Sequence, residues 1–250
     1  MKPQHARSRP SIPLQSRGFS PALFLPAAVA TGVSLALLAV RIRYTNGGRH
    51  LSLPWDLFLG WFPVGLAWLF HRVAGRPEPR RWALVASFLG WLLFFPNAPY
   101  LLTEVVHLAA TPAGAMHRSR WVADLLGASG PPRPPPFWLE FLLLSSVGFA
   151  GLLLTVAQVA VVRAALAGRS SPRAAGRFVV AALLLAGVGV ALGRYERLNS
   201  WEAVSAPEKV VDHAVAATTQ FRVPVTGLVF GLMLVLVELT VRGVRGDREE

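Results

Sequence analysis

Glutamate and histidine stand three residues apart in the segment YLLTEVVHL, near the middle of the chain. On a helix this spacing places Glu104 and His107 on one face, together with Tyr100 and Thr103. A Glu-x-x-His pair recurs in metal sites of helical bundles, where other helices supply the remaining ligands. The carboxylates that could complete such a site are Asp56, Glu140 and Glu202. The alternative is a hydrogen-bonded structural network, which is favoured because a two-residue match is common by chance. No cofactor is assigned on this basis.

A second polar segment, GRYERLNSW, carries two arginines three residues apart. The guanidinium groups of Arg194 and Arg197 could clasp a phosphate or a carboxylate between them. The alternative is an interfacial belt, in which these arginines pair with Glu104, Glu140 or Glu196. Arg and Tyr at the end of an apolar segment more often form such a belt than an anion-binding site.

Two prolines interrupt the apolar segment that precedes Glu104. Pro96 and Pro99 each remove a backbone donor and crowd the preceding turn, so they predict a kink or break in the helix. A broken helix that lines a cavity is a feature of transporters. An ordinary kink near the membrane interface is the favoured interpretation.

Long apolar runs surround these polar groups and decide the class of protein. Hydrophobic residues make up 53% of the sequence and charged residues 15%, below the roughly one quarter typical of soluble domains. Several runs approach the ~20 residues that a membrane-spanning helix needs. The absence of cysteine excludes disulfides and thiolate metal sites. The net charge of +12 is dispersed in small groups between the runs, as at membrane flanks, so no nucleic-acid partner is predicted.

The apolar runs predict an all-α fold, a polytopic transmembrane helix bundle with about six spans. A transmembrane helical domain is expected over residues 21–241, with a disordered basic cytoplasmic tail at 1–20 and a short cytoplasmic tail at 242–250. The predicted spans lie near 21–40, 55–71, 82–108, 137–162, 178–195 and 223–241. An amphipathic helix is expected between the last two spans, with Pro207 in its first turn. Glycines four residues apart, Gly189/Gly193 and Gly227/Gly231, predict close helix packing.

Orientation follows from the distribution of Lys and Arg, which are more frequent on the segments that are cytoplasmic if both termini are inside. This topology brings the starts of spans two and four and the ends of spans three and five to the extracytoplasmic face. Polar groups beside hydrocarbon normally pair with each other or line a cavity, so we expect one polar cluster there. Its candidate members are Asp56, Asn97, Tyr100, Thr103, Glu104, His107, Glu140, Arg194, Arg197, Asn199 and Glu202.

Four blocks of the sequence resemble those of a bacterial membrane family, domain of unknown function 1361. The blocks are WDLFLGWFP, WLLFFPNAPYLLTEVVHL, FWLEFLLLSSVGFAGLLL and LGRYERLNSWE, in the family's order. The resemblance implies a multi-span integral membrane protein of bacteria and supplies no activity. The chain departs from the family in having Asp56 where Asn is more frequent, and Glu104 and Glu140 where Asp is more frequent. The proline-rich loop before Phe137 resembles an insertion.

The sequence leaves three functions open for a multi-pass protein of the bacterial inner membrane. A structural or accessory role, in which the polar cluster fastens the helices together, is favoured. The first alternative is an enzyme that acts on a lipid head group or a lipid-linked substrate, and the second is a small-solute transporter. The expected partners are the lipid bilayer and a lipid or small anionic ligand. No oligomeric state is predicted.

Overall fold

The computed structural model describes residues 21–109, 125–127, 131 and 133–245. Every regular element within these residues is a helix. Six helices are long and apolar enough to cross a membrane: Pro21–Thr45, Leu53–Ala74, Arg81–Leu108, Phe137–Ala167, Pro172–Tyr195 and Arg222–Val244. The predicted all-α fold with six spans is therefore confirmed, and the chain is a multi-pass membrane protein. The predicted tail at 1–20 and residues 246–250 lie outside the described residues.

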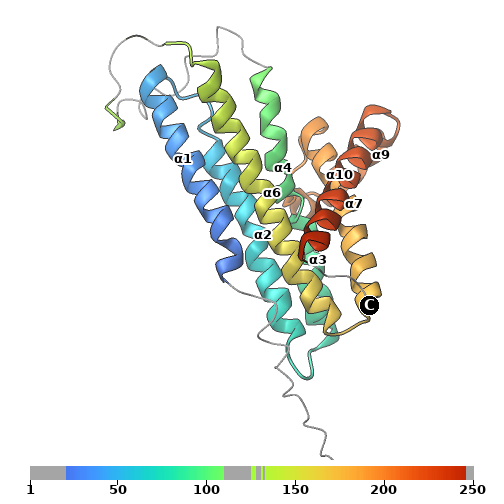
Figure 1. Cartoon of the computed structure of the whole chain (residues 1–250). Helices are drawn as coiled ribbons and strands as arrows, with labels where there is room; N and C mark the ends of the chain where they lie inside the picture. Colours follow the sequence, from blue (N-terminus) through green and yellow to red (C-terminus); the bar gives the residue numbers. More distant parts are fainter. Residues whose placement is uncertain (1–20, 110–124, 128–130, 132, 246–250) are drawn as a thin grey trace, which may run out of the picture.

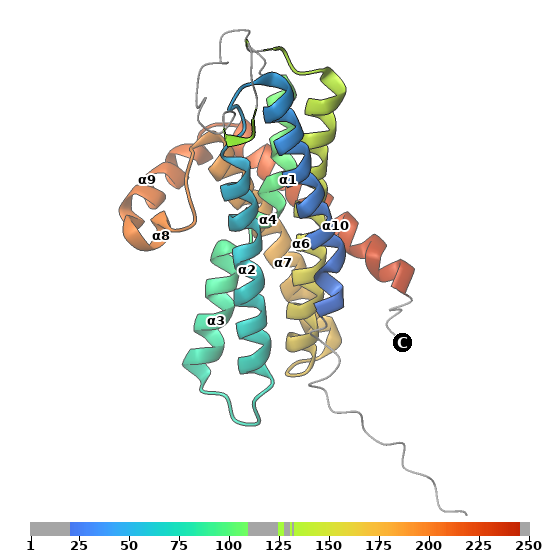
Figure 2. The ribbon, with the colours of Figure 1, turned by 90° about the vertical axis from the view of Figure 1, so that its left-hand side faces the viewer.

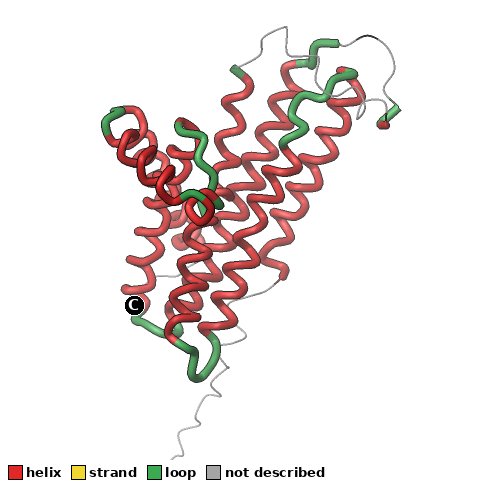
Figure 3. Tube along the Cα trace, turned by 180° about the vertical axis from the view of Figure 1, so that it is seen from behind, coloured by secondary structure: helices red, strands yellow, loops and turns green. Residues whose placement is uncertain are grey.

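Helix α6 (Phe137–Ala167) is the central element of the bundle. It packs against η2–α1 (Pro21–Phe24 and Leu25–Thr45), α2 (Leu53–Ala74), η3 (Leu101–Leu108) and α7 (Pro172–Tyr195). Figure 1 shows α1, α2 and α6 side by side, with α7 and α10 (Arg222–Arg245) on one side of them. In the sequence, α7 is followed by α8 (Glu202–Ser205) and α9 (Pro207–Thr218), and then by α10. Figures 2 and 3 show α8 and α9 projecting from the bundle. Pro207 begins α9, as the sequence predicted.

The third span consists of three consecutive segments. Helix α3 (Arg81–Phe94) ends before the first proline, α4 (Asn97–Tyr100) follows, and η3 continues as a 3-10 helix. Pro96 and Pro99 have no N–H to donate to the preceding turn, so regular α-helical bonding is lost between Phe94 and Asn97. The backbone of Phe95 and Pro96 nevertheless keeps right-handed helical angles. Figure 2 shows α3 and α4 as separate segments. The bend of the helix axis stays a prediction.

Two pairs of polar side chains inside the bundle connect different helices. The indole N–H of Trp91 donates to the carbonyl oxygen of the fully buried Gln158 at 3.2 Å. Arg163 of α6 and Glu238 of α10 form an ion pair of 2.9 Å. Lipid offers no hydrogen bonds, so each of these pairs removes the cost of exposing a polar group to hydrocarbon.

Glycines bring α7 into close contact with two neighbouring elements. A Cβ atom on Gly187 would lie 2.3 Å from the carbonyl oxygen of Gly227, and one on Gly231 would lie 2.9 Å from the Cα atom of Leu184. On another face of α7, a Cβ on Gly189 would lie 2.7 Å from Pro96 Cγ. The small residues therefore let the α7 backbone approach both α10 and the interrupted third span.

We predict that Gly187→Ala strongly lowers the melting temperature of the purified protein, because the added methyl group collides with the α10 backbone. Gly176→Ala is the matched control on the same helix, since a Cβ there meets nothing within 4 Å. Alanine also has the higher helix propensity, so this control should leave the melting temperature unchanged or slightly raised. Thermal unfolding followed by tryptophan fluorescence measures both. Equal effects of the two substitutions would contradict the close packing of α7 on α10.

Candidate functional site

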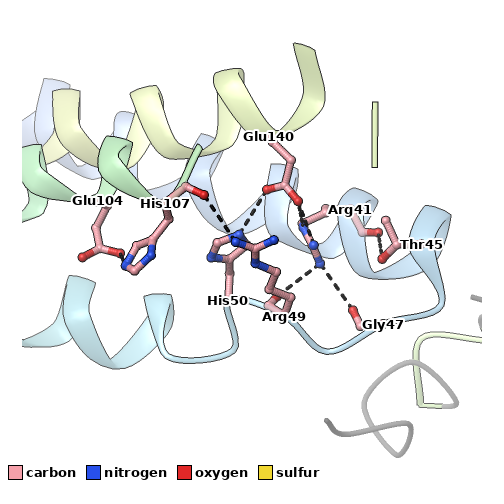
Figure 4. Close-up of polar contacts among 8 residues, drawn as sticks. All are labelled: Arg41, Thr45, Gly47, Arg49, His50, Glu104, His107 and Glu140. Atoms are coloured by element: carbon pink, nitrogen blue, oxygen red, sulfur yellow. Dashed lines mark hydrogen bonds and ion pairs between the residues drawn. The ribbon is translucent and has the colours of Figure 1, made fainter. Parts of the chain in front are cut away.

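A buried ion-pair cluster lies where α1 ends and α6 begins. Arg41, in the last turn of α1, donates from Nε and Nη2 to the same Glu140 carboxylate oxygen, at 2.8 and 2.7 Å. The second Glu140 oxygen lies 3.1 Å from His50 Nε2. Figure 4 shows Arg41 and His50 pointing toward Glu140 from two sides. Glu140 is 8% exposed and Arg41 is 2% exposed, so water solvates neither charge well.

The loop between α1 and α2 is shaped around this cluster. The Arg41 guanidinium also donates to the backbone carbonyls of Gly47 and Arg49, and Arg49 in turn donates to the carbonyl of His107 at 3.3 Å. His50 has a positive φ of 68°, a conformation that residues other than glycine rarely adopt. The contacts around Arg41 and Glu140 must offset this local strain. The loop is therefore fixed against both α6 and η3.

A second cluster joins the third span to the end of α7. Glu104 Oε2 lies 3.5 Å from His107 Nε2, and Glu104 Oε1 lies 3.6 Å from Arg194 Nη1. Arg194 also donates to the hydroxyl of Tyr100 at 3.2 Å and to the carbonyl of Thr103 at 2.9 Å. Glu104 is 4% exposed. Tyr100, Thr103 and Glu104 of the third span therefore all contact Arg194 of α7.

A cavity of about 910 Å³ opens beside the second cluster, between α2, the third span and α7. Polar lining residues include Asp56, Asn97, Tyr100, His107, Arg194 and Arg197, and its apolar lining includes Leu59, Leu93 and Leu192. Asp56 interacts electrostatically with both Arg194 and Glu104. Asn97 accepts a hydrogen bond of 3.4 Å from Ser200, while its buried side-chain nitrogen has no protein partner among the described residues. The cavity therefore offers both charge and free hydrogen-bonding capacity.

The predicted single cluster is divided into two. Asp56, Asn97, Tyr100, His107, Arg194, Arg197 and Asn199 all line the cavity. Glu140 belongs to the ion-pair cluster instead, and the two groups meet where the rings of His50 and His107 lie 6.0 Å apart. The backbone carbonyl of Thr103 accepts a hydrogen bond from Arg194, and the Thr103 hydroxyl donates to the backbone carbonyl of Tyr100.

Glu202 lies apart from both clusters and makes local contacts. Its carboxylate accepts hydrogen bonds from Lys209 and from the backbone N–H of Asn199, and these hold the pKa of Glu202 below its usual value. Asn199 also donates from its side chain to Glu202 at 3.3 Å. These contacts close the turn at the start of α8.

The proposed metal site has no third ligand in the described part of the chain. No group of three or more His, Asp or Glu side chains there is arranged to hold a metal ion. Glu104 and His107 are instead placed to exchange protons or to orient one another and Arg194.

Sequence reasoning missed Arg41, Arg49 and His50. Arginine is common at the ends of membrane spans, but one helical face of α1 carries a signal that Arg41 is buried. Ser34, Leu38, Arg41 and Thr45 recur at helical spacing, and all four are buried. A polar residue in register with such a face points into the bundle. No comparable signal marks His50, which lies in a loop.

These features define a multi-pass helical membrane protein with a polar cavity and an adjoining buried ion-pair cluster at one end of its bundle. Residues 55–237 match the family described as "Protein of unknown function (DUF1361)", and the chain belongs to this family. The match covers most of the chain and confirms the resemblance found in its sequence blocks. No curated protein and no solved structure matches the chain.

We predict that Glu140→Gln destabilises the protein by about 3 kcal/mol, because Arg41 then remains buried without a counter-charge. Glu202→Gln is the control, since it removes the carboxylate of an exposed pair with Lys209, and exposed pairs contribute little to stability. Unfolding of both variants in the same detergent, followed by tryptophan fluorescence, compares them. A loss no larger for Glu140→Gln than for Glu202→Gln would show that the buried pair does not hold α1 to α6.

Proposed function

We propose that the cavity binds the anionic head group of a lipid or lipid-linked molecule. The observation that carries this proposal is that Arg194 and Arg197 line the same cavity of about 910 Å³. Guanidinium groups bind phosphate and carboxylate through charge-assisted hydrogen bonds. Arg197 makes no hydrogen bond or ion pair with another described residue, so its donors are available to a ligand.

The composition of the cavity wall supports an amphiphilic ligand rather than a simple ion. Leu59, Leu93 and Leu192 give the cavity apolar walls beside the arginines. Asn97, whose side-chain nitrogen makes no hydrogen bond with a described residue, adds a neutral donor. A lipid with a charged phosphate in its head group and apolar acyl chains matches this mixture.

The location of the protein is part of the same proposal. We place it in the bacterial inner membrane with both termini in the cytoplasm, which puts the cavity at the extracytoplasmic face. The excess of Lys and Arg on the opposite segments supports this orientation. The likeness of its sequence blocks to a bacterial membrane family supports the cellular location.

A structural or accessory role is the second candidate function, and one observation favours it. The cluster of Arg41, His50 and Glu140 is buried and faces no part of the cavity. Such a cluster fastens α1, α6 and the intervening loop without needing a ligand. An enzymatic role would use Glu104 and His107 for proton transfer to a bound head group. Transport of a small solute would require the cavity to connect both faces of the membrane.

The orientation has a direct test. Cysteine introduced at the exposed Ser52 should react with an impermeant thiol reagent added to intact cells, whereas cysteine at Ser170, in the loop after α6, should not. The chain has no native cysteine to interfere. Permeabilised cells, in which both positions should react, provide the control. The reverse labelling pattern would place the cavity at the cytoplasmic face.

If the first cavity binds a lipid head group, replacing either of its arginines should weaken the binding of an anionic lipid. We expect Arg197→Gln to weaken the binding of a short-chain phosphatidic acid about tenfold, because one charge-assisted hydrogen bond is lost. Arg194→Gln should have at least that effect, but it also breaks contacts with Tyr100 and Thr103. Isothermal titration of the detergent-purified protein measures the dissociation constant.

Arg222→Gln is the matched control for this titration, since Arg222 stands at the start of α10, stacks on Tyr195 and does not line the cavity. Its affinity should equal that of the wild type. If Arg197→Gln also binds like the wild type, the head-group proposal fails. A lowered melting temperature of Arg194→Gln without any loss of affinity in either variant would then favour the accessory role.

A further inference from the structure

A second cavity lies at the other end of the bundle, far along α2 and α6 from the site described above. It has a volume of about 610 Å³ and is bordered by the last turn of α2, the loop that follows it and the last turn of α6. Asp56 and Glu140 stand in the first turns of these two helices, whereas this cavity lies at their last residues. Figure 1 shows both helix ends on the same side of the molecule.

Basic side chains gather around this cavity. Arg72, Arg76 and Arg169 line it together with His71, and no acidic residue is among its described lining. The loop from 75 to 80 contains one acid, Glu78, which does not line the cavity. Three guanidinium groups from two chain segments therefore face one space with no carboxylate to neutralise them there.

Two of these arginines are held in place by protein contacts. The Arg72 guanidinium stacks on the indole of Trp68, 4.9 Å from the ring centroid. Arg169 donates from Nε to the carbonyl of Ala74 at 2.6 Å and from Nη2 to that of Arg76 at 2.5 Å. Pre-oriented guanidinium groups lose less conformational entropy when an anion binds.

The C-terminal ends of α2 and α6, which border the second cavity, influence how well it can bind an anion. Carbonyl groups at the C-terminal ends of α2 and α6 repel negative charge. Arg169 donates to the carbonyl of Ala74, the last residue of α2, and to that of Arg76 in the loop beyond it. The bond to Ala74 removes part of that repulsion, and Arg169 Nη1 makes no hydrogen bond with a described residue. The buried His71 Nδ1 likewise has no hydrogen-bond partner among the described residues. Three positive charges outweigh the partial negative charges of two helix ends.

The wall opposite the arginines is made of small residues. Ala164, Ala165 and Gly168 line the cavity from α6, so space remains open between this helix and the α2 loop. Trp68, which stacks on Arg72, is 41% exposed, and tryptophan is enriched where membrane-spanning helices meet the lipid head groups. The cavity is thus positioned at a membrane interface, where phosphate groups of lipids lie.

We propose that this second cavity is a binding site for the phosphate group of an anionic phospholipid, held by Arg72, Arg76 and Arg169. The proposal is independent of the head-group function assigned to the first cavity, because the two sites share no residue. The bound lipid would link the α2–α3 loop to the end of α6.

The test uses the full-length protein and native mass spectrometry with added phosphatidylglycerol or phosphatidylcholine. The wild type should bind phosphatidylglycerol more tightly than phosphatidylcholine. Arg72→Gln/Arg76→Gln should weaken phosphatidylglycerol binding at least about tenfold, since each arginine near a bilayer contributes severalfold. Arg76→Gln alone, whose side chain makes no hydrogen bond with a described residue, should weaken it about threefold without affecting folding.

The matched control is Arg173→Gln/Arg177→Gln, which removes the same charge from exposed positions on α7 at the same end of the bundle. Because neither arginine lines the cavity, the affinity of this variant for phosphatidylglycerol should fall by much less than that of Arg72→Gln/Arg76→Gln. An equal loss in the control and cavity variants, or no preference for phosphatidylglycerol in the wild type, would overturn the proposal. Displacement of the lipid by millimolar inorganic phosphate would assign the site to a soluble phosphate compound instead.

Discussion

The fold depends on a charged pair that is buried between two membrane-spanning helices. Arg41 and Glu140 come from the first and fourth spans, and neither can leave its partner without exposing a charge to a medium that does not solvate it. Their contact fixes the end of α1 against the beginning of α6 and dictates the path of the loop between them. Through Arg49 and His50 that path reaches η3, so the pair also positions the segment that carries Glu104 and His107.

The cavity lies beside the third span, where regular α-helical bonding is interrupted between α3 and α4. Pro96 and Pro99 interrupt it, and the α4 segment then packs against α7 at Gly189 and Gly193, where a larger residue would collide with Pro96 or crowd Tyr100. The same interruption turns Tyr100 and Glu104 toward Arg194. The glycines of α7 allow its backbone to approach the interrupted third span closely. At that distance Arg194 can contact both Tyr100 and Glu104.

The sequence predicted the class and the spans because hydrocarbon thickness sets the length of an apolar run, which can be read directly. It also predicted the face shared by Tyr100, Glu104 and His107, since helical spacing determines that face. The division of the polar residues into two groups could not be predicted, because it depends on Arg41 and His50. Arg41 resembles any arginine at a span end. Its burial can be inferred only from its helical spacing relative to Ser34 and Leu38, which lie on the same face of α1. His50 reaches Glu140 through a backbone conformation that its residue type does not indicate.

The glycine contacts between α7 and α10 have a consequence for how the protein is made. Helix α7 leaves the ribosome before α10, and α8 and α9 are synthesised between them. Until the last span has entered the membrane, the face of α7 that carries Gly187 has no neighbour to fill it. The helix that carries Arg194 therefore gains its packing against α10 only when synthesis of the chain is almost finished. A nascent chain that stopped before residue 222 would contain the residues that line the cavity and would still lack the support that holds them in place.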